Sequence, residues 1–280
     1  MQKTLHKYKS VNALKTVEIN RRFKQGRGTG FGINYKPYLT VRDVPSKGRA
    51  HRLVSSTVNR VHHLLSDLEL NTFYIFDWFE EVTDIREQFP IPLNHSMEVC
   101  SNLNIKHPSV KGVNQVVTTD FIFDTVKGKR IAVSVKYSDE LENERTYEKQ
   151  LIEKAYWESK GILFKIHTEK QVPKLVVENI KSIHPYLLKF KLLKNQRTEY
   201  FELLISFFQK YPASIVHNIT AELDNIYNSE MGHHLMIFRH LLAQRAFGYD
   251  FNKFTLRDLK AKSVLISENW LSNRIIYVAS

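Results

Sequence analysis

An aspartate and a lysine lie in two neighbouring segments that both have the pattern of β-strands. Asp120 stands among apolar and β-branched residues in the stretch 116–125, and Lys136 ends the stretch 130–136. The lysines and glycine at 127–129 are typical of a turn, so a hairpin is expected. Because alternate side chains of a strand share a face, Ser134 and Lys136 are expected to point the same way.

An acid and an amine placed in this way have the form of a site that cleaves phosphodiesters. Such cleavage needs a hard cation, which carboxylate oxygens bind, to neutralise phosphate charge and to acidify a water molecule. A nearby ammonium orients that water or offsets developing charge. Taken alone, however, an Asp and a Lys on adjacent strands are more often a simple ion pair.

The charge of the chain is concentrated at its N-terminal end. The formal net charge is +12, and residues 61–280 contain as many acidic as basic side chains. Such an asymmetry points to a polyanion, most commonly nucleic acid, because Lys and Arg release counterions from a phosphate backbone. A solubilising tail or an anionic membrane surface remains the alternative. The 14 basic residues of this segment are Lys3, Lys7, Lys9, Lys15, Arg21, Arg22, Lys24, Arg27, Lys36, Arg42, Lys47, Arg49, Arg52 and Arg60.

Length and composition place the chain among soluble two-domain proteins. It has 280 residues, 42% of them hydrophobic, and no apolar run long enough to cross a membrane. The polar N-terminus does not have the form of a signal peptide, so a cytoplasmic location is expected. Cys100 is the single cysteine, which excludes an internal disulfide and a thiolate zinc site, and a buried bystander thiol is expected.

The remaining pattern predicts a mixed α/β domain over residues 1–185, followed by a small, mainly helical and possibly winged-helix domain over residues 186–280. The glycine-rich segment 26–32 is interpreted as a flexible turn, because no strand precedes it and no Lys-Ser or Lys-Thr pair follows it. A basic hairpin is expected over 38–60, a core helix over 61–79 and a strand over 82–89. Further helices are expected at 142–160, 173–183, 198–209, 215–227 and 232–246, with a strand at 162–167.

Five stretches of the chain resemble the TnsA family, the endonuclease subunits of heteromeric cut-and-paste transposases. They are HRLVSSTVNRVHHLLSDLELNTF (51–73), DIREQFP (84–90), IKHPSVKGVNQVVTTDF (105–121), VSVK (133–136) and ERTYEKQLIEKAYWESKGI (144–162). The resemblance is collinear over about residues 17–183 and weakens in the last third of the chain. It implies a restriction-endonuclease-like catalytic domain.

The resemblance also implies the roles of individual residues. Glu69 and Asp120 would bind the metal, Mg²⁺ with Mn²⁺ as a substitute, and Lys136 would contact the attacking water or the scissile phosphate. Such an enzyme hydrolyses the 5′ strand at each transposon end, while a TnsB-like transposase cuts the 3′ strand and a TnsC-like AAA+ ATPase engages the C-terminal domain. The lone subunit of this family is typically inactive, and the assembled machine works at the bacterial nucleoid.

Two points remain open on the sequence. Ser134 occupies a position that is Asp or Glu in restriction enzymes and Gln in the best-known TnsA-like sequence, so a metal position is expected to be filled by water or by another oxygen, from Asp124 or Glu148. A catalytically vestigial DNA-binding subunit and a free-standing restriction endonuclease are the alternatives. DNA phosphates near the cut are expected to meet Arg49, His51, Arg52 and Arg60.

Overall fold

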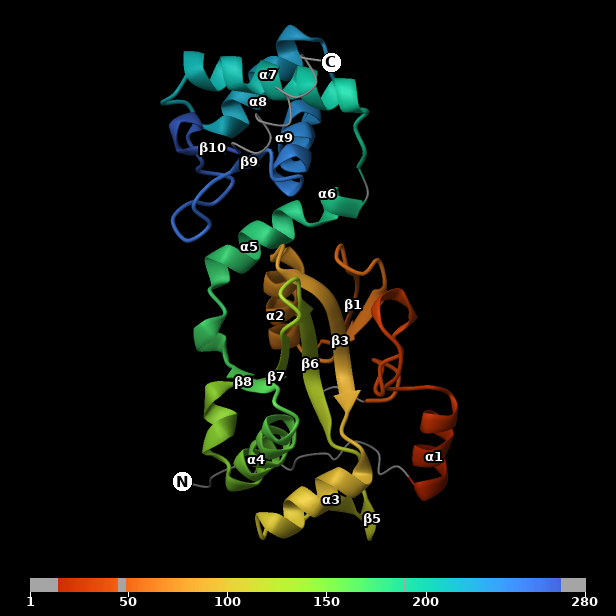
Figure 1. Ribbon diagram of the computed structural model, residues 1–280. Helices are drawn as coiled ribbons and strands as arrows, with labels where there is room; N and C mark the ends of the chain where they lie inside the picture. The colour runs from red at the N-terminus through yellow and green to blue at the C-terminus, as the bar shows by residue number, and fades with distance from the viewer. Residues whose placement is uncertain (1–14, 45–48, 189, 268–280) are drawn as a thin grey trace. The chain divides into compact units, whose positions relative to one another are not determined.

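The computed structural model describes residues 15–44, 49–188 and 190–267. The chain divides into two compact units, residues 1–172 and 173–280 (Figure 1). This division lies ahead of residue 186, where the sequence pattern placed the boundary. Within the described residues, no helix is long and apolar enough to cross a membrane.

The first unit is built on a four-stranded mixed sheet. Its strand order is β3-β6-β7-β8, with β3 antiparallel to β6, β6 antiparallel to β7, and β7 parallel to β8. The expected hairpin is therefore confirmed as β6 and β7. The sheet strands are β3 (Val82–Pro90), β6 (Thr118–Thr125), β7 (Arg130–Val135) and β8 (Leu163–His167).

Helices and small hairpins surround this sheet. The α-helices of the first unit are α1 (Thr16–Lys24), α2 (Asp67–Trp78), α3 (Leu93–Asn102) and α4 (Glu144–Ser159). The hairpins are β1 (His51–Val54) with β2 (Val61–Leu64) and β4 (Ser109–Val110) with β5 (Val113–Asn114). Short 3-10 helices are η1 (Gly32–Asn34), η2 (Ser138–Glu142) and η3 (Glu169–Gln171).

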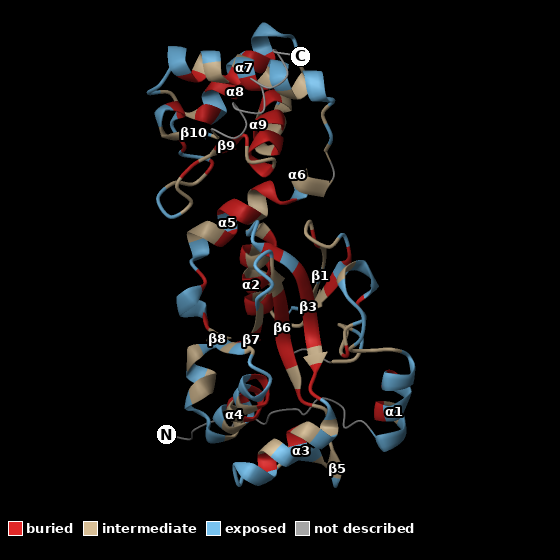
Figure 2. Ribbon diagram, viewed as in Figure 1, coloured by how far each residue is buried: buried red, intermediate tan, exposed pale blue. Residues whose placement is uncertain are grey.

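Apolar side chains on both faces of the sheet form the core, and β3 and β6 are buried along most of their length (Figure 2). Phe123 of β6 stacks on Phe76 of α2 at 3.8 Å between ring centroids. The next residue back along the strand, Ile122, packs in a buried cluster with Ile152 and Trp157 of α4. The alternation of a strand thus directs β6 toward α2 on one face and α4 on the other.

The segment before α2 differs from its prediction. The pattern from Val61 indicated a helix, but residues 61–64 form β2, paired with β1. The helix begins at Asp67 because the side chain of Ser66 caps it and accepts from the backbone N–H of Glu69 at 3.1 Å. The basic hairpin expected over 38–60 lies instead at 51–64.

The glycine-rich segment packs closely against the end of β3. Gly28 has a positive φ of 80°, and a Cβ there would lie 2.2 Å from Cγ of Pro90. A side chain would therefore collide with the sheet. Arg22, which precedes this segment, and Arg27, which lies within it, bind Asp43 at 2.9 and 2.6 Å. The segment is a built part of the domain, and these two arginines are used internally.

One residue of β3 has a left-handed backbone. Gln88 has a φ of 48°, a conformation that costs a residue with a Cβ about 1–2 kcal/mol. Its carbonyl accepts from the backbone N–H of Tyr38 at 3.2 Å, and the Tyr35 hydroxyl donates to the carbonyl of Glu87 at 3.0 Å. These contacts from the segment before the β1–β2 hairpin hold the strand in its bent form.

The second unit is mainly helical. Its helices are α5 (Lys174–Ile183), α6 (Pro185–Leu188), α7 (Lys194–Lys210), α8 (Val216–Ile226) and α9 (His233–Ala243), followed by β9 (Phe247–Gly248), the 3-10 helix η4 (Ala261–Ser263) and β10 (Leu265–Ile266). Strands β9 and β10 form a two-stranded antiparallel sheet. Helix α5 belongs to this unit because Asn179 donates to the carbonyls of Phe251 and Phe254 at 3.2 and 2.7 Å.

Candidate active site

Asp120 is the centre of a buried polar cluster in the first unit. Its Oδ2 accepts from the backbone N–H of Val135 at 2.7 Å, from Nζ of Lys136 at 2.9 Å and from Oγ of Ser134 at 3.2 Å. All three donors come from the end of β7 and the residue that follows it. The neighbouring strand therefore determines the orientation of this carboxylate.

Lys136 is held at the point where β7 ends. Its backbone N–H donates to the carbonyl of His167 at 3.0 Å, and its Nζ also donates to the carbonyl of Val135 at 2.8 Å. Burial alone would lower the pKa of Lys136, but Asp120 and Glu153 outweigh it and raise that pKa above its usual range. The amine is therefore a fixed positive charge beside Asp120.

Glu69 approaches the same cluster from the first turn of α2. Its Oε2 accepts from the backbone N–H of Leu65 at 3.0 Å and from Nε2 of Gln88 at 3.3 Å. The same Nε2 donates to Oδ1 of Asp120 at 3.4 Å. The structure thus brings together Glu69, Asp120 and Lys136, the three residues singled out from the sequence. The amide nitrogen of Gln88 lies between the two carboxylates.

A third buried carboxylate, Glu153 of α4, was missed by the sequence analysis. Its Oε1 accepts from Nε2 of Gln150 at 3.4 Å, while its Oε2 is buried without a hydrogen-bond partner among the described residues. One signal was present: Glu153 lies one helical turn before the buried Trp157, where a charge is unusual.

Two of these carboxylates, Glu69 and Glu153, have pKa values above the usual range for a carboxyl group. Burial and the charge of Asp120 raise the pKa of Glu69 to about 7 and that of Glu153 to about 8. The single positive charge of Lys136 does not balance the charges of three ionised carboxylates. The cluster therefore holds more negative charge, when ionised, than its own cation balances.

The cluster opens to solvent through a cleft of about 470 Å³. Asp120, Lys136 and Glu153 line it, together with basic side chains from α4 and apolar residues that precede β6. Arg145 and Lys149, one turn apart on α4, place further positive charge along its wall. An anionic ligand in the cleft could therefore approach Asp120 and Lys136, whereas Glu69 does not line it.

Comparison with known proteins identifies the family of the chain. A model described as "TnsA-like endonuclease N terminal" matches residues 79–169, and one described as "TnsA endonuclease C terminal" matches residues 171–251. The chain is 36% identical over 274 residues, 97% of its length and 99% of the relative's, to the "Transposon Tn7 transposition protein TnsA" of Escherichia coli. The chain belongs to the TnsA family of transposon endonucleases.

Nucleases of the TnsA family are typically metal-dependent, and the donor chemistry of the cluster fits a hard cation. As they stand, no three His, Cys, Asp or Glu side chains among the described residues are gathered closely enough to hold a metal ion. Mg²⁺, however, keeps several waters and needs only one or two carboxylates. Glu69 and Asp120 offer these, and the raised pKa values and the unpaired oxygen of Glu153 are features that a cation would relieve.

Ser134, where this member departs from the TnsA pattern, is fully buried. Its hydroxyl donates to Asp120 at 3.2 Å. The two acids that the sequence offered as metal ligands in place of Ser134 form ion pairs instead. Asp124 binds Arg86 and Arg130, and Glu148 binds Arg145. Among the described carboxylates, Glu153 is the additional acid that lines the cleft with Asp120.

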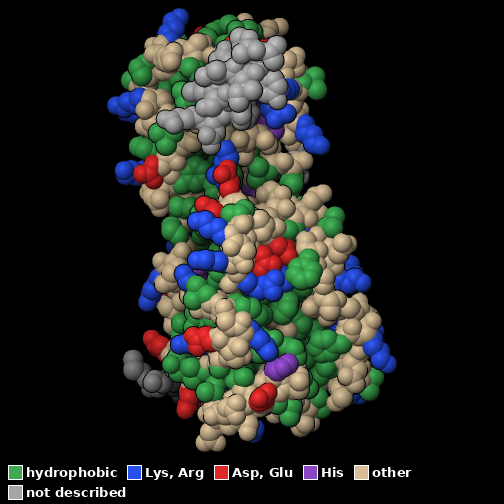
Figure 3. All heavy atoms as spheres, in the orientation of Figure 1, with side chains coloured by type: hydrophobic (Ala, Val, Ile, Leu, Met, Phe, Trp, Pro, Cys, Tyr) green, Lys and Arg blue, Asp and Glu red, His purple; other side chains and the backbone are tan. Residues whose placement is uncertain are grey.

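The four residues expected to contact DNA are not equivalent in this TnsA-family chain. Arg49 is largely exposed and lies 3.5 Å from Asp67, while His51 binds Asp67 at 2.7 Å. Arg52 is exposed on β1. On the face drawn in Figure 3, Lys and Arg side chains are scattered among apolar and uncharged ones.

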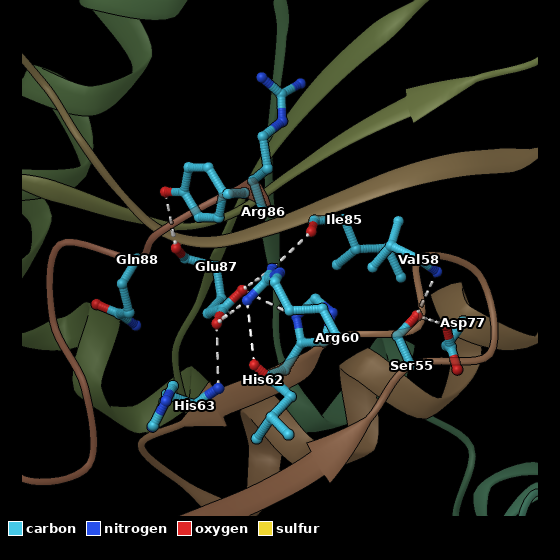
Figure 4. A network of polar contacts seen from close by, with 12 residues as sticks. Ser55, Val58, Arg60, His62, His63, Asp77, Ile85, Arg86, Glu87 and Gln88 are labelled. Carbon is cyan, nitrogen blue, oxygen red and sulfur yellow. Dashed lines mark hydrogen bonds and ion pairs between the residues drawn. The ribbon is translucent and has the colours of Figure 1, made fainter. Parts of the chain in front are cut away.

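Arg60 departs from the expectation because it is buried in an ion-pair network (Figure 4). Its guanidinium donates to Oε2 of Glu87 at 2.6 Å and to Oε1 at 2.8 Å, and it lies over the ring of Tyr35. His62 contacts the same carboxylate at 2.8 Å. We therefore leave Arg60 out of the proposed DNA contacts, because its charge is already neutralised inside the fold.

Proposed function

We propose that this member of the TnsA family hydrolyses the 5′ strand at transposon ends, with Glu69, Asp120 and Lys136 as the reacting groups. One observation carries the proposal. Two carboxylates from separate elements share an amide donor, and a fixed ammonium lies on one of them at 2.9 Å, beside an open cleft. A mere ion pair would need neither the second carboxylate nor the cleft.

Each residue has a distinct task in this proposal. Mg²⁺, bound through Glu69 and Asp120, would neutralise the phosphate and lower the pKa of a water molecule. Lys136 is directed by its two hydrogen bonds and supplies positive charge where the transition state becomes more negative. Arg49 and Arg52, which are exposed, would hold the DNA backbone without reading its sequence.

We also propose partners of the kind that the family implies: a TnsB-like transposase that cuts the 3′ strand and a TnsC-like AAA+ ATPase. The long match of the chain to a transposition protein, over 97% of its length, supports this assignment. The second unit, matched by the TnsA C-terminal model, is the proposed contact for the ATPase.

The test is cleavage of an end-labelled transposon terminus by the assembled proteins in Mg²⁺. Asp120→Ala and Glu69→Ala should each abolish 5′ cutting and leave the partner's 3′ cutting intact, so that joining yields replicative products. Glu148→Ala is the matched control, since this acid of α4 pairs with Arg145 instead.

Near-normal 5′ cutting by either alanine variant would contradict the site assignment. A wild-type chain that supports 3′ cutting and assembly but never nicks the 5′ strand would favour the vestigial, DNA-binding alternative. Cutting without any partner would favour a free-standing endonuclease.

A further inference from the structure

Gln88 lies between the two carboxylates to which we assign the metal. The register of β3 and β6 pairs Glu87 with Phe121 and Phe89 with Thr119, so Gln88 and Asp120 face each other between these pairs. The Nε2 of Gln88 donates to Glu69 at 3.3 Å and to Asp120 at 3.4 Å. Its Oε1 accepts from Oγ1 of Thr118 at 3.2 Å.

The backbone at Gln88 is a second, independent observation. A left-handed φ of 48° in a strand is uncommon for Gln, which lacks the local hydrogen bonds that let Asn or Asp tolerate it. Strained conformations of this kind persist where the surroundings hold them, and they concentrate at functional sites. Here the N–H of Tyr38 and the hydroxyl of Tyr35 hold the strand on either side.

A neutral donor suits this position better than a charged one. Two carboxylates in a buried space repel each other, and an amide N–H restrains both without cancelling their charge. A Lys or Arg there would supply the positive charge that a metal ion is needed to provide. The amide thus fixes the spacing of the two acids and leaves their charge for a cation.

We infer that Gln88 is a positioning residue, which sets the separation of Glu69 and Asp120 for metal binding at the cost of a strained backbone. This inference rests on the proposed function of the site. It leads to a result that a merely structural role does not give. Replacement by Gly relieves the backbone but also removes a buried side chain and the shared donor, so the Asn variant, which keeps an amide, is needed to separate the two effects.

The experiment compares Gln88→Gly and Gln88→Asn with wild type in three measurements. Thermal unfolding without metal measures the stability of each variant, and calorimetric titration measures its affinity for Mg²⁺. The rate of 5′ cutting in the assembled complex measures catalysis. We expect the Gly variant to unfold at a somewhat lower temperature, because it loses a buried side chain with three hydrogen bonds, and the Asn variant to unfold closer to wild type. Its Mg²⁺ affinity and 5′ cutting should both fall by about 10- to 100-fold.

The Asn variant keeps an amide on a shorter side chain and tolerates the left-handed backbone, so it should recover part of both losses. Asn104→Gly is the control, because Asn104 is an exposed residue with a similar φ of 52°, away from the site. It should change neither Mg²⁺ affinity nor cutting.

Two results would overturn the inference. Either the Gly variant binds Mg²⁺ and cuts within twofold of wild type, or its losses match a drop in unfolding temperature and the Asn variant recovers nothing. Asp120→Ala is run beside it. If that variant still cuts the 5′ strand, or if wild type binds no Mg²⁺, the proposed function is wrong. The inference about Gln88 is then wrong as well, because it rests on that function.

Discussion

Two buried charge clusters meet on strand β3, at the adjacent residues Glu87 and Gln88. In the first, Glu87 is bound by Arg60 and His62, and every partner is almost fully buried. Although burial favours the neutral acid, His62 and Arg60 hold the pKa of Glu87 well below its usual range. In the second, which Gln88 joins, burial and Asp120 raise the pKa of Glu69 and Glu153.

The difference shows that burial of charge does not by itself indicate function. The Arg60 cluster is balanced and its carboxylate oxygens are fully bonded, so it has no capacity left for a ligand. The Asp120 cluster has surplus acid, a cleft, and a Glu153 oxygen for which the described part of the chain provides no hydrogen-bond partner. The proposed metal site is thus distinguished from the Arg60 cluster by negative charge that its own residues do not balance.

The largest expected effect comes from breaking the balanced cluster. Arg60→Ala leaves Glu87, which is fully buried, without its bidentate partner. Removal of one member of a buried ion pair costs about 3–5 kcal/mol of unfolding free energy. Urea unfolding would measure it. His62 remains as a partner, so the loss is expected near the lower end of that range.

Arg52→Ala is the control for this prediction, because Arg52 is an exposed arginine on the same hairpin. It should change the unfolding free energy by less than about 0.5 kcal/mol. If the two variants prove equally stable, the ion pair of Arg60 with Glu87 does not stabilise the fold.

These two arginines cannot be distinguished by their place in the sequence. Both belong to the basic first 60 residues, and composition treats every charge alike. Three of the 14 basic residues, Arg22, Arg27 and Arg60, are in fact held by Asp43 or Glu87. Their acid partners lie up to 27 residues away along the chain. Such pairings depend on tertiary structure, which local patterns do not contain.

The second prediction uses the sign of the pKa shifts. Glu153 has a folded-state pKa of about 8, above its ordinary value, so between about pH 5 and 8 the folded chain binds more protons than the unfolded one. Its contribution to stability therefore falls as pH rises through this window. Glu153→Gln should raise the metal-free unfolding free energy at pH 8, on the order of 1–3 kcal/mol, and change it less at pH 5.5.

Glu87→Gln should behave in the opposite way. The pKa of Glu87 is lowered, so its contribution is fully present above about pH 4.5 and is lost only at lower pH. The variant should be less stable than wild type by a similar amount at pH 5.5 and at pH 8. Urea unfolding in the presence of a chelator measures both. Equal pH dependence of the two variants would remove the contrast between the clusters.

Local patterns did predict the elements that carry the site. Strands β6 and β7, helix α4 and strand β8 all lie where alternation and helical spacing placed them, and Asp120 and Lys136 are joined as expected. Helix α2 was placed correctly, but its start was not. The turn between β1 and β2 depends on Asp77, which accepts from Ser55 and Ser56 across more than 20 residues. No local signal predicts that contact.

The third prediction concerns the exposed arginines. Neutralising Arg49 and Arg52 together should weaken binding about equally on transposon-end DNA and on random DNA. It should also lower the slope of log affinity against log salt by about 2, because each phosphate contact releases about one counterion. Neither residue is buried, so stability should not change. A loss confined to the transposon end would instead identify these side chains as base readers.

The smallest expected effect is at Ser134, whose single hydroxyl contacts the central carboxylate of the proposed active site. Ser134 is one of three donors to Oδ2 of Asp120, and the other two are closer. Ser134→Ala should therefore cost about 0.5–1.5 kcal/mol of stability. It should slow 5′ cutting by less than about tenfold.

Ser134→Gln tests whether this position could serve as a metal ligand, as the family pattern suggests. The site is fully buried, so a longer side chain must displace its neighbours, at a cost of about 1–3 kcal/mol. We expect lower stability and no gain in Mg²⁺ affinity by calorimetry, because the side chain at this position faces a carboxylate oxygen that keeps two closer donors, the N–H of Val135 and Nζ of Lys136. Tighter Mg²⁺ binding without loss of stability would show that the strand can present a ligand here. In the wild-type chain a water molecule would then occupy the coordination position that the Gln side chain fills in the variant. Glu153 would not be needed as a further metal ligand.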